Sequence, residues 1–108
     1  MIDREAVRRT LLARRAELAE RVGRLDADLH HREGPPPPDF AEQASEQENL
    51  EVMHALEAEG RSELARVERS LARLERGEYE SCARCGATIA PARLAALPYA
   101  ETCIRCAD

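Results

Sequence analysis

The sequence has no tryptophan, no lysine and only three aromatic residues, and these shortages exclude several classes of protein. Aromatic residues make up 3% of the 108 residues, whereas charged residues make up 34% and hydrophobic residues 44%. A barrel, a sandwich or a doubly wound sheet would need more strand-forming residues and more chain. Abundant charge is typical of long solvated helices, so an all-α protein is expected, and its length allows one small domain or one domain plus an extended appendage.

Long apolar runs are also absent. No stretch approaches the roughly 20 apolar residues that a membrane-spanning helix needs. The first ten residues, MIDREAVRRT, lack the apolar core of a signal peptide, so a cytoplasmic location is expected. Nothing in the chain indicates a substrate pocket, and we expect no enzymatic activity.

The excess negative charge lies in the middle of the chain. Residues 39–63 contain eight acidic residues and one arginine, whereas residues 1–33 and 64–108 each carry a net charge of +1. A protein that binds a phosphate backbone needs the opposite sign, so direct DNA binding is not expected. The acidic segment suits a basic partner or cleft better, although it could equally be a solvated helix face.

Two long helices are predicted, over residues 3–33 and 39–76. In the first, Leu11, Leu18 and Leu25 recur every seven residues. Gly34 and the four prolines that follow must end it, and they predict a stiff bend. The second helix is predicted to end at Gly77, and its apolar residues fall on two heptad positions: Leu50, Met53, Leu64, Val67, Leu71 and Leu74.

Folding these helices antiparallel about the prolines predicts a specific register. It places Val22 near Met53, Leu25 near Leu50 and Leu11 near Leu64. Arg14 and Arg15 then come opposite 57–60, which predicts a salt bridge to Glu57 or Glu59. A coiled coil between two chains is the alternative, and the short bend favours pairing within one chain.

All four cysteines lie in the C-terminal segment, in the pattern C-x2-C-x17-C-x2-C formed by Cys82, Cys85, Cys103 and Cys106. This spacing is typical of a four-thiolate zinc site, and four thiolates leave no position for a catalytic water. One structural Zn²⁺ is therefore expected, with two disulfides or a redox-active pair as alternatives. A short helix is predicted with Pro91 in its first turn and Pro98 after its end. The predicted domains are a hairpin over 1–77, with its tip at 34–46, and a zinc lobe over 78–108.

The residues around the cysteines carry a family resemblance. The segment GEYESCARCG over 77–86, with Leu97, Pro98 and Tyr99 before Cys103, resembles the zinc finger of the DksA/TraR family of bacterial transcription regulators. The resemblance covers roughly residues 39 to 106. It implies a monomer that binds RNA polymerase directly, with its coiled coil in the secondary channel and acidic tip residues altering open promoter complexes.

The family's tip pattern is D-x-x-D-x-A, and the corresponding residues are Asp39, Glu42 and Ala44. Glu42 keeps the charge of the second aspartate but extends it by one methylene. The same residues also fit a helix start, because Asp39 is a good N-cap and Glu42 completes a capping-box pattern. Phe40 is either a contact residue or packs against Leu29 or His30.

The resemblance also bears on the alarmone ppGpp. In relatives that respond to ppGpp, two basic residues stand at the positions that align with Leu97 and Ala107. The helix that usually follows the last cysteines in the family is also missing. Weak or absent ppGpp dependence is therefore expected. Two functions remain as alternatives to polymerase binding: a zinc-stapled interaction adaptor and a nucleic-acid-binding zinc module. The second would need a basic face and exposed aromatic residues.

Overall fold

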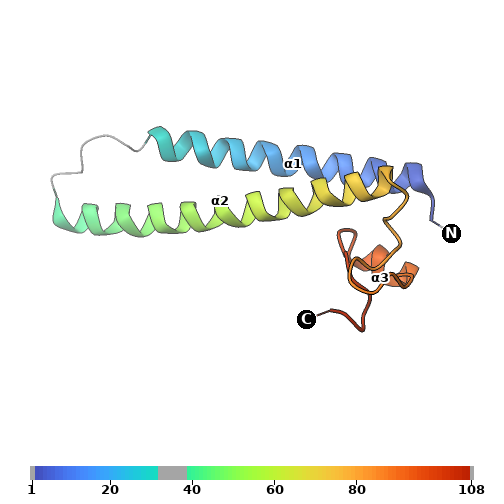
Figure 1. Cartoon of the computed structure of the whole chain (residues 1–108). Coiled ribbons are helices and arrows are strands. Elements are labelled where there is room, and N and C mark those ends of the chain that lie inside the picture. The colour runs from blue at the N-terminus through green and yellow to red at the C-terminus, as the bar shows by residue number, and fades with distance from the viewer. Residues whose placement is uncertain (1, 32–38, 108) are drawn as a thin grey trace. The chain divides into compact units, whose positions relative to one another are not determined.

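The computed structural model describes residues 2–31 and 39–107, and this part of the chain is all-α. Helix α1 spans Arg4–His31, α2 spans Phe40–Glu75 and α3 spans Pro91–Ala96. Figure 1 shows α1 and α2 side by side with opposite chain directions, which confirms the predicted hairpin of two long helices. The predicted bend at the prolines lies outside the described residues. No helix in 2–31 or 39–107 is long and apolar enough to cross a membrane.

The chain divides into two compact units. The tip unit comprises residues 17–64, and the lobe unit comprises residues 1–16 together with 65–108. Each unit therefore contains a part of α1 and a part of α2. The division at residue 77 expected from the sequence stays a prediction.

The core of the tip unit is a narrow seam between the two helices. Leu18, Val22 and Leu29 of α1 are 0%, 6% and 8% exposed. On α2 the buried residue is Gly60, and a Cβ atom placed there would lie 2.9 Å from Cγ2 of Val22. The backbone of α2 therefore approaches Val22 closely, at a point where any larger residue would have to displace a neighbour.

This contact corrects the predicted register. Val22 lies against Gly60 and not near Met53, so the helices are shifted by seven residues, one full heptad, from the expected pairing. Antiparallel spacing then places Leu25 opposite Glu57 rather than Leu50. A second contact in the tip unit agrees with this register, since Arg61 Nη2 lies 3.7 Å from Asp26 Oδ1.

The salt bridge predicted between Arg14 or Arg15 and Glu57 or Glu59 depended on the predicted register and is wrong for the same reason. Glu57 Oε2 is paired within its own helix, 3.4 Å from Nη2 of Arg61. Arg14 instead donates from Nε to the hydroxyl oxygen of Tyr99 at 3.2 Å, inside the lobe unit. The physical reason is that a leucine heptad repeats every seven residues, so its pattern does not distinguish one heptad register from the next.

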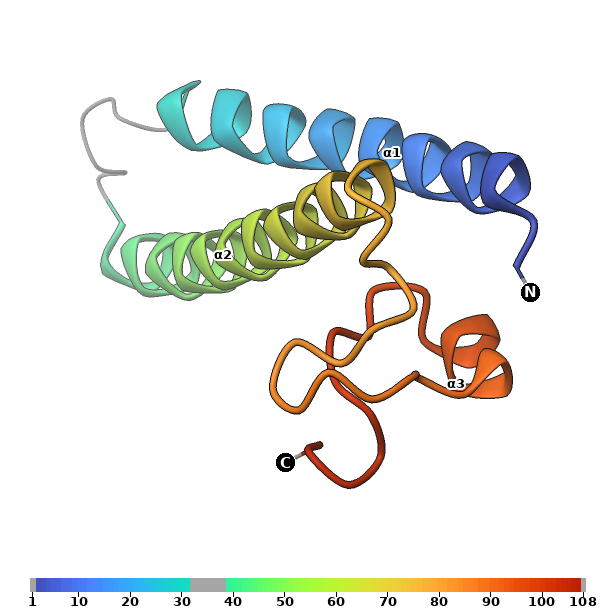
Figure 2. The same ribbon diagram turned by 45° about the vertical axis from the view of Figure 1, so that its right-hand side comes forward.

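The core of the lobe unit brings together the ends of the long helices and the C-terminal segment. Its buried apolar residues are Leu11 of α1, the α2 residues Val67, Leu71 and Leu74, and three residues after α2, namely Tyr79, Ile89 and Leu94. Tyr79 is 4% exposed, and its hydroxyl donates to the carbonyl oxygen of Pro98 at 2.6 Å. Beyond α2 this segment consists of turns and loops around α3 (Figure 2).

Helix α2 ends where the sequence predicts. Gly77 has a φ of 74°, the left-handed conformation that glycine adopts without steric cost. Its N–H donates to the carbonyl of Leu74 at 3.1 Å, and the N–H of Glu78 donates to the carbonyl of Arg73 at 2.8 Å. This pair of bonds is a Schellman motif. Arg4 also donates from Nη2 to the carbonyl of Leu74 at 2.8 Å, so the end of α2 is tied to the start of α1.

Candidate metal centre and helical tip

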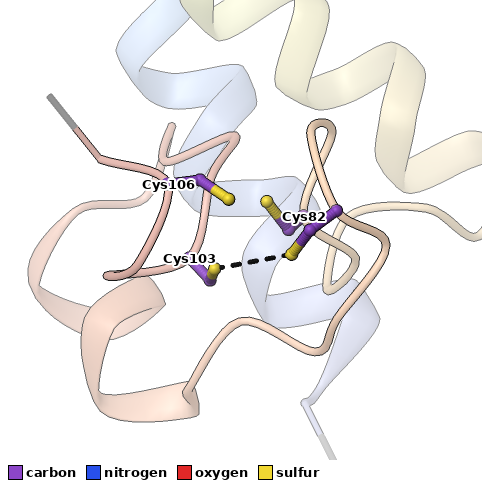
Figure 3. Close-up of side chains that lie close together, drawn as sticks. Cys82, Cys103 and Cys106 are labelled. Atoms are coloured by element: carbon purple, nitrogen blue, oxygen red, sulfur yellow. Dashed lines mark hydrogen bonds between the residues drawn. The ribbon is translucent and has the colours of Figure 1, made fainter.

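The structure brings the four cysteine sulfurs together. The four Sγ atoms, those of Cys82, Cys85, Cys103 and Cys106, all lie within 4.8 Å of one another. In Figure 3 the sulfurs of Cys82, Cys103 and Cys106 point toward one another. All four residues are free thiols, so the structure contains neither of the two disulfides considered from the sequence.

A tight turn presents the first cysteine pair. Gly86 has a φ of 76°, and its N–H donates to the carbonyl of Cys82 at 2.9 Å, which closes the loop over the two thiols. The N–H of Cys82 donates to the carbonyl of Ala87 at 2.7 Å, and a single antiparallel bridge pairs Ser81 with Thr88. The chain on either side of the turn is thereby fixed, and both sulfurs face the same way.

The second pair sits on a similar turn. The N–H groups of Cys106 and Ala107 both donate to the carbonyl of Cys103 at 3.0 Å. One further bond joins the two turns, since the N–H of Ala83 donates to the carbonyl of Glu101 at 2.7 Å. A main-chain hydrogen bond therefore links the segments that carry the two cysteine pairs, which are separated by 17 residues in the sequence.

The spacing of the sulfurs fits a tetrahedral metal ion. Zinc–thiolate bonds are about 2.3 Å long, so the edge of a zinc–sulfur tetrahedron is roughly 3.8 Å. The Sγ atoms of Cys85 and Cys103 are 3.7 Å apart. A disulfide would bring them to about 2.05 Å. The donor set and its spacing therefore match a four-thiolate zinc site.

The surroundings of the sulfurs favour thiolates at part of the cluster. Main-chain N–H groups of Cys103, Cys85 and Arg84 lower the pKa of Cys82 to about 6. The N–H of Cys106 lowers the pKa of Cys103. Hydrogen bonds to Cys85 and Cys82 raise the pKa of Cys106 to about 12. Four negative charges at this spacing require a cation among them, because like charges so close together do not ionise simultaneously.

The tip residues lie at the start of α2. Asp39 accepts hydrogen bonds at Oδ1 from the N–H groups of Ala41 at 2.7 Å and Glu42 at 3.3 Å, so it is the N-cap of the helix. Asp39, Glu42 and Ala44 are all exposed. Phe40 is 86% exposed, and the alternative in which it packs against Leu29 or His30 is therefore wrong.

Comparison with known protein families identifies both parts of the chain. Residues 7–74 match the DnaK suppressor protein-like N-terminal domain, and residues 77–108 match the prokaryotic dksA/traR C4-type zinc finger. The chain belongs to the DksA/TraR family. The solved structure of transcription factor DksA2 from Pseudomonas aeruginosa superposes with a TM-score of 0.81 at 31% identity, covering 94% of this chain and 78% of that one.

A second relative matches a shorter part of this chain. An uncharacterised protein of Aquifex aeolicus is 38% identical over 45 residues, which are 42% of this chain and 31% of that protein. The chain thus matches less than a third of the length of this curated relative.

Membership of the DksA/TraR family settles several expectations. The resemblance inferred from the cysteine segment is confirmed, and the C4 zinc finger confirms the prediction of one structural Zn²⁺. The DksA family consists of transcription factors without enzymatic activity, so the prediction of a non-enzyme is confirmed as well.

Two arginines around the cysteine cluster, Arg84 and Arg93, are structural, which was not predicted from the sequence. Arg84 donates from Nη1 to the carbonyl of Cys106 at 3.1 Å, and Arg93 donates from Nε to the carbonyl of Thr102 at 3.0 Å. Isolated arginines in a charged sequence are typical of solvated surface. The only signal was position, because Arg84 lies inside the first C-x2-C pair.

Proposed function

We propose that this protein is a DksA-family transcription regulator that binds bacterial RNA polymerase directly through the secondary channel. Acidic residues at the start of α2 act there on open promoter complexes. The proposal includes action as a monomer in the cytoplasm, without direct binding to DNA. The family match over residues 7–74 and 77–108 supports this assignment.

The observation that carries the proposal is the exposure of the tip residues. Asp39 and Glu42 stand on the first turn of a helix with their neighbours Phe40 and Ala44 exposed as well. The capping bonds of Asp39 use Oδ1, so its carboxylate can shape the helix start and still present negative charge to a partner. The segment 39–63 carries a net charge of −7, which suits a basic channel.

We further propose that Cys82, Cys85, Cys103 and Cys106 are the four ligands of the zinc ion. When bound, the ion would neutralise the thiolates and hold the two turns together. With four protein ligands it would have no open position for substrate, so its role is structural.

Weak ppGpp dependence is also part of the proposal. Leu97 and Ala107 line one cavity of about 500 Å³ together with Arg66, Arg69 and Arg93. Leucine and alanine cannot pair with a phosphate. Each of the three arginines already has a contact within the lobe unit, to Tyr99, Glu101 and Thr102 respectively. Adding ppGpp to the transcription assay below should change the response little.

The test combines polymerase binding with transcription from a ribosomal promoter. We would compare the zinc-loaded protein with an Asp39→Asn, Glu42→Gln double variant. Asparagine caps helices as well as aspartate does, and glutamine keeps helix propensity, so this variant removes charge without unfolding the tip. A Glu48→Gln, Glu51→Gln variant is the matched control, because it removes two exposed charges from α2 outside the tip.

We expect all three proteins to bind polymerase and only the Asp39, Glu42 double variant to lose the effect on transcription. If that variant regulated normally, the tip assignment would be wrong. No binding by any of the three would reject the polymerase proposal and favour an adaptor with another basic partner. A gel shift of the zinc-loaded protein on duplex and single-stranded DNA would reveal the remaining alternative, a nucleic-acid-binding zinc module.

A further inference from the structure

Arginines recur along one side of the last turns of α2, apart from the leucine seam. Arg66, Arg69 and Arg73 are spaced three and four residues apart, so they share one face of the helix. The guanidinium carbon of Arg66 lies 5.3 Å from the ring centroid of Tyr99. Arg69 donates from Nε to Oε1 of Glu101 at 2.7 Å. This arginine stripe therefore faces the C-terminal segment within the lobe unit.

Arg73 is the buried member of the stripe. It is 8% exposed, and its Nη2 donates to the carbonyl of Glu78 at 3.0 Å and also to the carbonyl of Ser81. Ser81 is the residue directly before Cys82 in the chain. One guanidinium thus fixes the backbone where it enters the first cysteine pair.

The second cysteine pair is held in the same way. Arg93 of α3 donates from Nε to the carbonyl of Thr102 at 3.0 Å, and Thr102 directly precedes Cys103. Arg69 binds Glu101, one residue earlier. Each cysteine pair is therefore preceded by a main-chain carbonyl that accepts from an arginine.

The thiolates of the metal centre would offer a negative counterpart to the charge of Arg73. A buried charge is costly unless it is compensated, and the acceptors described for Arg73 are neutral carbonyls. Four thiolates around one divalent cation carry a net charge of −2. A guanidinium hydrogen-bonded to the residue beside a ligand would offset part of this charge and fix the ligand's approach.

We infer that Arg73 is a positioning residue of the metal centre, acting through the carbonyl of Ser81, and that Arg93 has the same role for the second cysteine pair. The inference rests on the proposed ligand set and is independent of polymerase binding. Without Arg73, the carbonyls of Glu78 and Ser81 each lose a donor, and the side-chain link from α2 to the residue before Cys82 is broken. Zinc should then be released faster.

The experiment measures zinc release from the full-length, zinc-loaded protein into an excess of a chromogenic chelator. Arg73→Met removes the charge and the donors. Arg76→Met is the matched control at the same helix end, because Arg76 is exposed and makes an exposed ion pair with Glu78 at 3.1 Å. Leu18→Ala is the stability control, since it removes a fully buried side chain from the tip unit.

We expect zinc release from Arg73→Met to be about tenfold faster than from the natural protein, as for other residues that orient metal ligands. Arg76→Met and Leu18→Ala should release zinc at the natural rate. Release from Arg73→Met no faster than from Leu18→Ala would overturn the inference, because a general loss of stability would then account for it. A natural protein that bound no zinc would instead reject the ligand set itself.

Arg73→Lys covers the case in which the methionine variant does not fold. Lysine keeps the charge, but its side chain is shorter, so its ammonium reaches the two carbonyls less well than Nη2 of Arg73 does, and a roughly threefold faster release is expected. Release at the natural rate would show that the bonds to the two carbonyls do not position the ligands. The absorption of the cobalt-substituted protein gives a second readout, since distortion of the tetrahedron shifts the cobalt bands.

Discussion

Replacing Gly60 with alanine should destabilise the protein, although the same change at an exposed helix position is stabilising. Glycine in an exposed helix interior is about 1 kcal/mol less favourable than alanine. Gly23 of α1 is such a position, because a Cβ atom there would meet nothing within 4 Å. Gly23→Ala should therefore stabilise the protein by about 1 kcal/mol.

Gly60→Ala should have the opposite sign. The new Cβ would lie 2.9 Å from Cγ2 of Val22, well inside ordinary van der Waals contact. Valine has one strongly preferred rotamer in a helix, so its methyl group cannot rotate away cheaply. Overpacking of this kind costs about 1–3 kcal/mol, against a gain of about 1 kcal/mol in helix propensity. A net loss of about 1 kcal/mol is expected.

Urea unfolding of the zinc-loaded protein, followed by circular dichroism, would measure both variants. The two alanine substitutions should differ by about 2 kcal/mol although their chemistry is identical. The double variant Val22→Ala, Gly60→Ala supplies the control, because removing the valine methyls makes room for the new Cβ. In that background Gly60→Ala should become stabilising. Equal stabilisation by Gly23→Ala and Gly60→Ala would refute the close approach of the helices and, with it, the observed register.

Three further predictions concern the lobe unit. Ser70→Ala should stabilise the fold by about 1 kcal/mol in urea unfolding, because the buried Oγ of Ser70 has no hydrogen-bond partner within residues 2–31 and 39–107; a loss of stability would contradict this reasoning. Burial raises the pKa of Tyr79 above 10.0, so the unfolded chain loses its phenolic proton first, and the free energy of unfolding should fall as the pH rises above 10. Tyr79→Phe should abolish this pH dependence. It should also lower the free energy of unfolding by about 1 kcal/mol, because it removes the hydrogen bond to the carbonyl oxygen of Pro98. Zinc removal by a chelator should abolish amide protection around Ile89 and Leu94 and leave it at Leu18; unchanged protection throughout would mean that the metal does not hold the lobe.

The boundaries of the helices were predictable because the chain marks them with residues of strong conformational preference. Asp39 caps the start of α2, and Gly77 ends it with a positive φ. The cysteine cluster was predictable for a related reason, since the C-x2-C spacing places two sulfurs on one turn. In both cases the determining interactions are local in sequence, so pattern alone is sufficient.

The arginine contacts were not predictable in this way. Arg66, Arg69 and Arg73 read as solvated charges because arginine is usually exposed, and Arg73 becomes buried only when the C-terminal segment folds back on α2. The stripe spacing of three and four residues was visible in the sequence. Its partners are main-chain carbonyl groups, Tyr99 and Glu101, and main-chain carbonyls have no sequence signature.

The register of the hairpin failed for a different reason, and the failure shows what decides it. A heptad of leucines is satisfied equally well after a shift of seven residues, so the choice depends on positions where the seam departs from leucine. Gly60 is such a position, since a buried glycine in a helix is costly unless a bulky partner fills the space beside it. Val22 is that partner. In the lobe unit Arg8 pairs with Glu75 at 2.7 Å, which fixes the same register by charge. The exceptions to the heptad, rather than the heptad itself, therefore specify how these two helices align.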